Sequence, residues 1–340
     1  MVIRIGVIGA GVMGGDHALT LAGSIQGAAP VAISDVDANK ASAVASAARI
    51  ERVHANVRSL IDDPAVDAVL IASPDATHEE LILACLSAGK PVLCEKPLAA
   101  TTEGCLRIVA AETNIGKRLV QVGYMRRFDP GYVTMRSALK SGQFGAPLLM
   151  HCTHRNANAP SWFDSSMLIS NSAVHEIDVA RWLLESEFTS VTVFKRRPPV
   201  PGALVDPQFI VLESRQGALV DIEVFVNAHY GYDVRAELVC EKGTLTLAPQ
   251  SPVHIRSSGQ ESSMLAQDWR AHFSAAYRTQ LQAWVDSIRT GVPVGASAWD
   301  GYAATDTAAA CLEALGSGQA TEVRLQPRPH FYATVPSLGP

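Results

Sequence analysis

A glycine motif near the N-terminus constrains the fold of this chain more than any other feature. Gly9, Gly11 and Gly14 follow a short β-branched run, Val2–Ile8, and precede an apolar-periodic stretch that ends near Gly27. Such glycines permit a tight turn and a close approach of the backbone to a pyrophosphate, whose charge lies at the N-terminus of the following helix. The pattern predicts the first βα unit of a dinucleotide-binding domain.

The second predicted strand supplies the carboxylate that such a site needs. Val31–Ser34 is strand-like, and Asp35 follows it about 20 residues after Gly14. A carboxylate there accepts hydrogen bonds from the adenosine ribose hydroxyls and repels a 2′-phosphate. The alternative, a glycine-rich turn with an unrelated surface aspartate, is disfavoured by this context. We therefore predict NAD rather than NADP. The residues predicted to bind it in this region are Gly9, Ala10, Gly11, Val12, Met13 and Asp35.

Alternating strands and helices continue to about residue 123. The predicted helices are Ala38–Ala48, Thr77–Ala88 and Thr101–Ile115, and the predicted strands between and after them are Asp67–Ala72, Pro91–Cys94 and Arg118–Val122. Repeated βα units of this length predict an α/β fold with a doubly wound parallel sheet and right-handed crossovers. We expect a Rossmann domain over residues 1–123.

A different pattern follows, with short strands joined by turns. The predicted strands are Leu148–His154, Ser190–Lys195, Phe209–Glu213, Ala218–Val226, Arg235–Cys240 and residues 244–248. One helix, Asn171–Leu184, lies among them, and Trp269–Thr290 and Trp299–Leu315 are helical near the end. We expect an α+β domain with a large, mostly antiparallel sheet over residues 124–325, and a poorly structured tail over residues 326–340.

Composition narrows the class of partner. The 340 residues carry a formal net charge of −5, and Lys and Arg form no basic stripe, so nucleic acid is not an expected partner. Apolar runs are too short to span a bilayer, so no membrane partner is expected either. The six cysteines are scattered without a CxxC pair, which is typical of reduced, buried thiols in a cytoplasmic protein.

Two further strand ends carry polar residues. One reads Ser73-Pro74-Asp75-Ala76-Thr77-His78, and the other reads Glu95-Lys96-Pro97. Both are at carboxyl ends of strands in an open α/β sheet, where ligands bind. A lysine in a rigid turn can donate a hydrogen bond to a substrate hydroxyl and stabilise a developing alkoxide. Taken alone, Glu95 and Lys96 are also consistent with a surface ion pair.

These motifs together resemble the Gfo/Idh/MocA oxidoreductases. The segments at Gly9–Gly14, Ser73–His78 and Glu95–Pro97 carry the resemblance in the first half of the chain. Segments beginning at Gly123, His151, His175 and Tyr230 resemble the inositol-oxidising branch of the family. The resemblance extends nearly to Glu322. It implies that Lys96 contacts both nicotinamide ribose and substrate, and that Ser73, Pro74, His78 and Glu95 also belong to the cofactor site.

The predicted helix from Asn171 carries the candidate base. Asn171, His175 and Asp178 are spaced to share one face of an α-helix. A histidine on a rigid helix is a suitable general base, because its pKa is close to working pH. Without the resemblance, Asn171 is equally explained as a helix N-cap and Asp178 as the partner of Arg181. With it, His175 is the expected base.

Asn171 departs from the family pattern, because inositol dehydrogenases carry aspartate at this place. An amide can hydrogen-bond a polyol but cannot pass a proton, so the departure concerns the proton relay and the preferred isomer. Arg126 and Asn156 offer donors and acceptors suited to a ring of hydroxyls, and the resemblance adds Asn171 and Tyr232 as substrate contacts. Strand alternation separates His151 from Cys152 and His154, so no metal site is predicted.

The resemblance implies an NAD-dependent dehydrogenase that oxidises a cyclic polyol, myo-inositol foremost. His175 would remove the hydroxyl proton and Lys96 would stabilise the developing negative charge. The alternatives are a dehydrogenase for another inositol isomer or a pyranose sugar, and an NAD-binding sensor without catalysis. Retention of Lys96 and His175 argues against the sensor. A homotetramer packed through the open face of the second sheet is implied as well.

Overall fold

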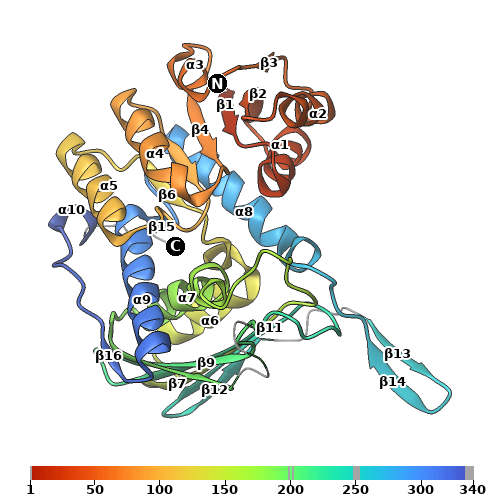
Figure 1. Ribbon diagram of the computed structural model, residues 1–340, viewed down its shortest axis with the longest axis vertical. Helices are drawn as coiled ribbons and strands as arrows, with labels where there is room; N and C mark the ends of the chain where they lie inside the picture. Colours follow the sequence, from red (N-terminus) through yellow and green to blue (C-terminus); the bar gives the residue numbers. More distant parts are fainter. Residues whose placement is uncertain (1, 198–199, 201–202, 248–252, 334–340) are drawn as a thin grey trace. The chain divides into compact units, whose positions relative to one another are not determined.

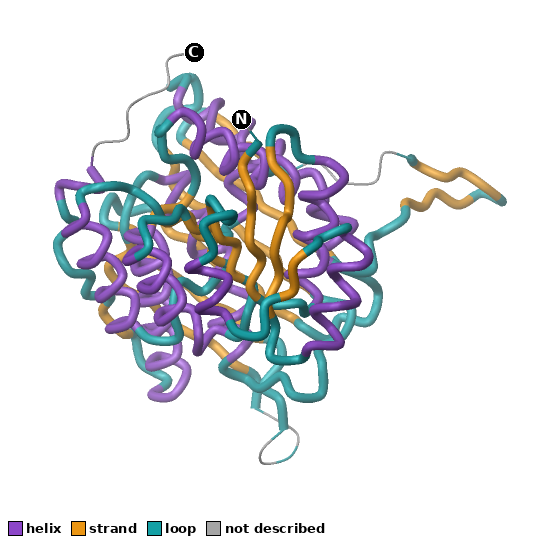
Figure 2. Tube along the Cα trace, turned by 90° about the horizontal axis from the view of Figure 1, so that it is seen from above, coloured by secondary structure: helices purple, strands orange, loops and turns teal. Residues whose placement is uncertain are grey.

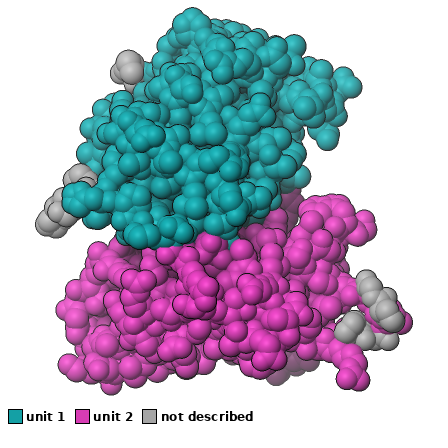
Figure 3. All heavy atoms as spheres, turned by 60° about the vertical axis from the view of Figure 1, so that its left-hand side comes forward, with its two compact units in different colours: residues 1–125, 277–305, 326–340 teal, residues 126–276, 306–325 magenta. Residues whose placement is uncertain are grey.

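The chain forms two compact units in the computed structural model, which describes residues 2–197, 200, 203–247 and 253–333. Unit 1 contains residues 2–125, 277–305 and 326–333, and unit 2 contains the described parts of 126–276 together with 306–325 (Figure 3). The predicted division after residue 123 is close to the first crossing. The predicted second domain was contiguous, whereas the chain returns to unit 1 for residues 277–305 and crosses again after 325.

Unit 1 contains a seven-stranded sheet with the order β15-β6-β5-β4-β1-β2-β3 (Figure 1). Its strands are β1 (Ile3–Ile8), β2 (Ala28–Ser34), β3 (Arg52–Val53), β4 (Ala68–Ile71), β5 (Val92–Cys94), β6 (Val120–Val122) and β15 (Ala296–Ser297). The first six are parallel, and β15 joins β6 antiparallel. The predicted doubly wound sheet is therefore confirmed. Its carboxyl ends place the loops after β1, β2, β4 and β5 at one edge.

Helices cover both faces of this sheet. They are α1 (Val12–Ser24), α2 (Ala38–Ala48), α3 (Val57–Asp62), α4 (His78–Ser87), α5 (Thr102–Ile115), α10 (His330–Ala333) and the C-terminal part of α8 (Trp269–Thr290). Ile5 and Val7 of β1 pack in one core with Leu21 of α1, Ala45 of α2 and Trp284 of α8. Asp37 caps α2 by accepting hydrogen bonds from two backbone N–H groups of its first turn.

Part of the predicted tail is ordered on unit 1. Tyr332 of α10 is completely buried, and its hydroxyl donates a 2.6 Å hydrogen bond to Glu112 of α5. The other carboxylate oxygen of Glu112 accepts from the backbone N–H groups of Leu119 and Val120. Residues 326–333 therefore belong to the packed structure, contrary to the prediction, and residues 334–340 are outside the described residues.

Unit 2 is built on a second seven-stranded sheet with the order β12-β11-β7-β10-β9-β8-β16. Its strands are β7 (Pro147–Arg155), β8 (Phe188–Lys195), β9 (Gln208–Ser214), β10 (Leu219–Phe225), β11 (Asp233–Cys240), β12 (Gly243–Thr246) and β16 (Thr321–Glu322). Every pairing is antiparallel except β7 with β10, so the predicted large, mostly antiparallel sheet is confirmed. A separate hairpin, β13 (His254–Ser257) and β14 (Gln260–Ser263), extends away from this sheet (Figures 1 and 2).

Helices of unit 2 cover one face of this sheet. They are α6 (Pro130–Lys140), α7 (Val174–Leu184) and the later part of α9 (Ala298–Ser317), and α7 packs against β7. The sequence analysis missed α6, although Asp129 caps it and Pro130 opens it. Along β7, Cys152 and His154 are buried beneath the helices, whereas His151 and Arg155 point to the other face. No helix among the described residues is long and apolar enough to cross a membrane.

Candidate active site

The glycine turn of unit 1 is shaped for an anion. Gly9 has a φ of +98°, and a side chain there would collide with the carbonyl of Ala72. A side chain at Gly14 would collide with the carbonyl of Gly9, so α1 can approach the strand only without one. At Gly11, in contrast, an added Cβ would meet no atom within 4 Å. Gly11 is the N-cap of α1 and offers no side-chain cap, which leaves the first-turn N–H groups for a ligand.

Asp35 directly follows β2, and its carboxylate stabilises the glycine turn. One carboxylate oxygen accepts from the backbone N–H of Ala10 at 2.6 Å, and the other accepts from that of Asp37 at 2.8 Å. Two bonds occupy only part of the acceptor capacity of a carboxylate, so lone pairs remain for ribose hydroxyls. Val12 is 63% exposed and Met13 is partly exposed beside the turn. The residues present therefore fit the adenosine and pyrophosphate parts of a dinucleotide.

The loop after β4 has an exposed side and a buried side. Pro74 is exposed, and the hydroxyl of Ser73 is 2.7 Å from that of Thr77. His78, predicted to contact the cofactor, is completely buried. Its Nδ1 is 2.7 Å from the Pro97 carbonyl oxygen and its Nε2 is 2.9 Å from that of Ser73. The structure corrects this prediction: a ring with both nitrogens engaged by the backbone supports the loop from behind.

Lys96 follows β5 in a turn whose other residues are buried. Lys96 itself is partly exposed, whereas Glu95 and Pro97 on either side of it are buried. The carboxylate of Glu95 is paired with His17 of α1, with 2.7 Å between Oε1 and Nε2. Sequence reasoning missed His17, because nothing in the helix pattern of α1 marks a buried polar position. The alternative of a surface ion pair does not describe this carboxylate, because Glu95 is buried and its Oε1 pairs with His17.

In unit 2 the candidate base lies where the helix geometry changes. A π-helical segment, Leu168–Ala173, leads directly into α7, so Asn171 is in π geometry while His175 and Asp178 are in the α-helix. The predicted single α-helix from Asn171 is wrong here, and α-helical spacing from Asn171 to His175 does not apply. The N-cap of α7 is Ala173, so Asn171 is not the cap either. Short π segments are frequent at functional sites.

Beneath His175 lies a buried cluster of charged and aromatic side chains. Arg126 and Glu176 form an ion pair, and each side chain is only 1% exposed. Nδ1 of His154 is 3.0 Å from Glu176 Oε2 and 3.2 Å from Arg126 Nη2, and its ring centroid is 6.5 Å from that of His175. Arg126, predicted to contact substrate, thus directs its guanidinium to protein partners. Its position makes it part of the scaffold beneath His175.

Burial and charge act against each other in this cluster. Burial alone would raise the pKa of Glu176, but Arg126 and His154 hold that pKa below its usual value. Burial would likewise lower the pKa of Arg126, and the Glu176 carboxylate outweighs it and raises that pKa. Both shifts favour the charged forms of the two side chains, in keeping with their direct ion pair.

Two other predicted substrate residues differ in their relation to this cluster, since Tyr232 packs against it and Asn156 follows β7. Tyr232 is buried, with its ring 6.0 Å from His154 and 5.2 Å from His272, and burial raises the pKa of its hydroxyl. Asn156 follows β7 and is partly exposed, with its backbone N–H bonded to the Phe225 carbonyl. Sequence reasoning missed His272, because it comes from α8, more than a hundred residues beyond β7.

Asp178 has a partner other than the one weighed from sequence. Its two carboxylate oxygens accept from Arg127 Nε at 2.9 Å and Nη2 at 2.6 Å, a bidentate buried pair. Arg181, the helical alternative, donates to both carboxylate oxygens of Glu187. On the opposite face of β7, His151 pairs with Asp221, which places it apart from Cys152 and His154. Among the described residues no group of three candidate ligands could hold a metal ion.

Comparisons with known proteins agree with both units. The family model described as oxidoreductase family, NAD-binding Rossmann fold, matches residues 3–124, and that of its C-terminal α/β domain matches residues 136–325. The chain is 55% identical over 337 residues to inositol 2-dehydrogenase 1 of Saccharopolyspora erythraea, covering 98% of this chain and 100% of that protein. It is 44% identical over 335 residues to inositol 2-dehydrogenase of Pseudomonas fluorescens, covering 98% and 99%.

A solved structure is similar over the same length. Myo-inositol dehydrogenase from Lactobacillus casei, in complex with NAD(H) and myo-inositol, matches with a TM-score of 0.94 and 36% identity, covering 98% of this chain and 100% of that one. A scyllo-inositol dehydrogenase from the same organism, with bound NAD(H) and scyllo-inositol, matches with a TM-score of 0.88 and 25% identity. The glycine turn with Asp35, the Lys96 turn and the two family models together place this chain in the Gfo/Idh/MocA family of NAD-dependent oxidoreductases.

Proposed function

We propose that this protein oxidises a cyclic polyol, myo-inositol foremost, at one ring hydroxyl with NAD as hydride acceptor. The observation that carries the proposal is the near-complete match to a dehydrogenase solved with both NAD(H) and myo-inositol. The two relatives named above are inositol 2-dehydrogenases, and their similarity to this chain extends over nearly their full length. This supports the same substrate class. The product would be the corresponding inosose, 2-keto-myo-inositol, as part of inositol catabolism.

The unit 1 residues have separate tasks toward the cofactor. The N–H groups at the start of α1 would bind the pyrophosphate, and Gly11 leaves the room that it needs. Asp35 would accept from the ribose hydroxyls and would repel the 2′-phosphate of NADP. Ser73 and Pro74 offer the exposed edge of the β4 loop to the same ligand. When bound, the nicotinamide supplies the acceptor for the hydride that leaves the carbinol carbon.

His175 and Lys96 would handle the hydroxyl. The His175 imidazole would take the proton from the substrate oxygen, since a neutral histidine is a base near pH 7. Lys96 would donate a hydrogen bond to the same oxygen as negative charge develops on it. Arg126, Glu176 and His154 would hold the end of α7 in one orientation, while Asn156, Asn171 and Tyr232 would contact the other hydroxyls.

A substrate panel tests the proposal directly. NADH formation should be measured with myo-, scyllo- and chiro-inositol and with glucose and galactose, each with NAD and with NADP. We expect oxidation of myo-inositol with NAD. A preference for scyllo-inositol would change the assigned isomer, and we would ascribe that change to Asn171. Preference for an aldose would show that the substrate is a sugar and not an inositol. Binding of NAD with no turnover of any substrate would favour the sensor.

The same assay tests Lys96 and Asp35. Lys96→Ala should reduce kcat by about 10²–10³-fold with NADH affinity nearly unchanged, because one oxyanion donor is worth that much in a dry site. Asp35→Ser should weaken NAD binding and improve the relative use of NADP. Equal use of both cofactors by the wild type would contradict the role of Asp35.

We further propose that the protein is a cytoplasmic homotetramer. The outward face of the unit 2 sheet exposes Phe194 and Phe209, with ring centroids 6.4 Å apart, and also Leu148 and Leu219. We expect this face to join copies of the chain into a homotetramer, and Phe209→Lys to lower the sedimentation coefficient. All six cysteines are buried and form no disulfide, which supports a cytoplasmic enzyme.

A further inference from the structure

The turn that carries Lys96 is contacted from two sides by buried histidines that have no part in the proposed chemistry. His17 comes from α1, one turn after the glycine motif, and is 2% exposed. Its Nε2 is 2.7 Å from Oε1 of Glu95, the residue before Lys96. His78 opens α4, and its Nδ1 is 2.7 Å from the carbonyl oxygen of Pro97, the residue after Lys96.

The Glu95 carboxylate has little freedom between its neighbours. Its second oxygen, Oε2, accepts from the backbone N–H of Lys96 at 3.3 Å. A Cβ built on Gly123 would be 3.0 Å from the same oxygen, so the strand end after β6 closes on the carboxylate. On the other side, the ring of Tyr277 meets the ring of His17 edge-on at 5.7 Å. His17 and Glu95 therefore fix the peptide nitrogen of Lys96 relative to α1.

His78 joins two loops at once. Besides Pro97, it contacts the carbonyl oxygen of Ser73 through Nε2 at 2.9 Å. Each ring nitrogen thus lies within hydrogen-bond distance of a backbone carbonyl oxygen of a different loop. Because the ring is completely buried, water cannot take the place of either partner. His78 thus ties the loop after β4 to the Lys96 turn after β5.

We propose that His17 and His78 are positioning residues for Lys96. The proposal rests on the proposed role of Lys96 in polyol oxidation. A lysine amine at the end of a flexible stem reaches one oxygen reliably only if its own backbone is held still, and His17 and His78 hold the residues before and after it. The same contacts tie Lys96 to the helix that binds the pyrophosphate and to the loop at its side, so cofactor site and lysine share one frame. Misplacement by about 1 Å costs on the order of 10²-fold in rate.

Matched substitutions separate the individual contacts. In His17→Gln the amide nitrogen can replace Nε2 toward Glu95, whereas His17→Leu keeps the volume and removes the bond. In His78→Asn the amide can replace Nδ1 toward Pro97, and in His78→Gln it can replace Nε2 toward Ser73. We expect His17→Leu and His78→Gln to lower kcat by about 10–100-fold, and His17→Gln and His78→Asn to retain most of it.

The readouts must distinguish positioning from general damage. We expect NADH affinity and the midpoint of thermal unfolding of His17→Gln and His78→Asn to remain near those of the wild type. We expect kcat to be lower in His17→Leu than in His17→Gln, and lower in His78→Gln than in His78→Asn. Equal loss in His17→Gln and His17→Leu, or equal loss in the two His78 variants, would overturn the proposal. So would kcat of His17→Leu within twofold of the wild type.

A double-mutant cycle asks whether the histidines act through Lys96. In a Lys96→Ala background, His17→Leu should cause almost no further loss of the residual rate, because the side chain that it positions is already gone. The same fold loss in both backgrounds would overturn the proposal. The wild-type rate on the inositol panel tests the proposed function by itself, so a wild type without turnover and an ineffective histidine variant are separate outcomes.

Discussion

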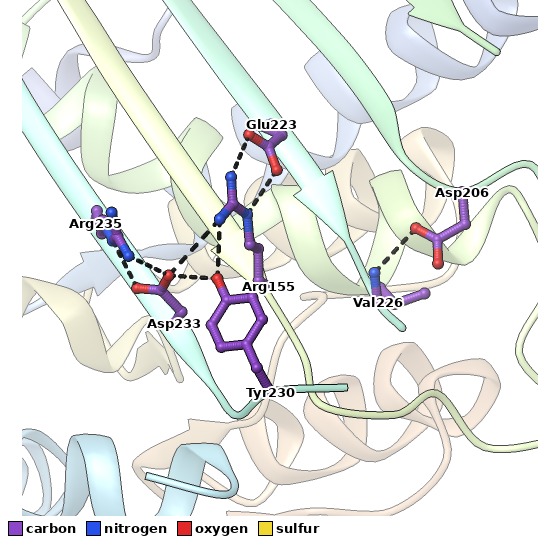
Figure 4. A network of polar contacts seen from close by, with 7 residues as sticks. All are labelled: Arg155, Asp206, Glu223, Val226, Tyr230, Asp233 and Arg235. Atoms are coloured by element: carbon purple, nitrogen blue, oxygen red, sulfur yellow. Dashed lines mark hydrogen bonds and ion pairs between the residues drawn. The ribbon is translucent and has the colours of Figure 1, made fainter. Parts of the chain in front are cut away.

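Strand β7 separates two polar networks built from the same kinds of side chain. His154 belongs to the buried cluster with Arg126 and Glu176, and its chain neighbour Arg155 belongs to a network on the opposite face. Figure 4 shows Arg155 between Glu223, Tyr230 and Asp233, and Asp233 also contacts Arg235. One residue step along a strand thus changes the surroundings of a charge completely.

The difference lies in access to water. The Arg126 and Glu176 side chains are 1% exposed, whereas those of Arg155 and Glu223 are 27% and 32% exposed. Water screens the outer pair and can solvate either partner alone, so such pairs contribute little to stability. The inner pair has no such substitute, and removing one partner leaves an uncompensated buried charge. The inner network is therefore expected to be rigid, as a support for His175 requires.

The largest expected effect comes from breaking the inner network. Glu176→Gln keeps the shape of the side chain but leaves Arg126 without its counterion. We expect the free energy of unfolding to fall by about 3–5 kcal/mol, measured by urea denaturation of the purified variant.

A second variant gives the matched control. Replacing both partners, as in Arg126→Met with Glu176→Leu, removes the charges together and should recover much of the lost stability. The double variant should nevertheless lose activity, because the support of His175 is changed. A double variant as unstable as Glu176→Gln would mean that shape rather than charge matters here.

The next largest effect is a dependence of the free energy of unfolding on pH, caused by His272 beside the buried cluster. Burial, and then the charge of Arg126, lower the pKa of His272 from 6.5 to about 4, while Asp233 acts in the opposite direction and His154 in the same direction as Arg126. Above pH 6.5 His272 is neutral in both states. As the pH falls from 6.5 to about 4, the unfolded chain binds a proton there that the folded chain does not, so stability falls.

His272→Phe tests this dependence and keeps an aromatic ring against Tyr232 and Phe273. Between pH 6.5 and 4 the free energy of unfolding should fall less steeply in the variant, by at most about 1.4 kcal/mol per pH unit. The difference should be smaller than this limit, since His272 is partly exposed. Parallel stability curves for the two proteins would show that His272 does not titrate on unfolding.

The two faces of β7 were predictable from sequence, but their partners were not. Alternation along the strand separates Cys152 and His154 from His151 and Arg155, and the structure confirms it. Glu176 and Arg126 reach His154 from other elements, and no local pattern encodes which helix covers a sheet. The π-helical segment before His175 is equally invisible, because its residues suit an α-helix as well.

Unit 1 was easier to predict because its site is local. The glycine turn and Asp35 belong to one continuous βαβ segment, and both lie at the carboxyl ends of the neighbouring parallel strands β1 and β2. His17 was missed within that same segment, since its partner Glu95 lies 78 residues away, in the turn after β5. Likewise, the return of residues 277–305 to unit 1 depends on packing of Trp284 in its core, which no boundary signal in the sequence announces.

The smallest expected effect concerns the outer face and sharpens the comparison. Arg155 donates to both oxygens of Glu223, at 2.7 and 2.8 Å. If water reaches this pair, a double-mutant cycle with Glu223→Gln and Arg155→Met should give a coupling energy of about 0.2–1 kcal/mol that shrinks in 1 M salt.

Assembly changes that expectation, because a second copy packed on this face would exclude water from the pair. The coupling energy measured in the assembled protein should then exceed that in a Phe209→Lys variant that no longer assembles, and it should resist salt. The cycle therefore measures whether the outer face is wet in the working enzyme. If the coupling energies in the two backgrounds were equal and sensitive to salt, water would reach the Arg155–Glu223 pair in the assembled protein too. The proposed tetramer would then have to use another face.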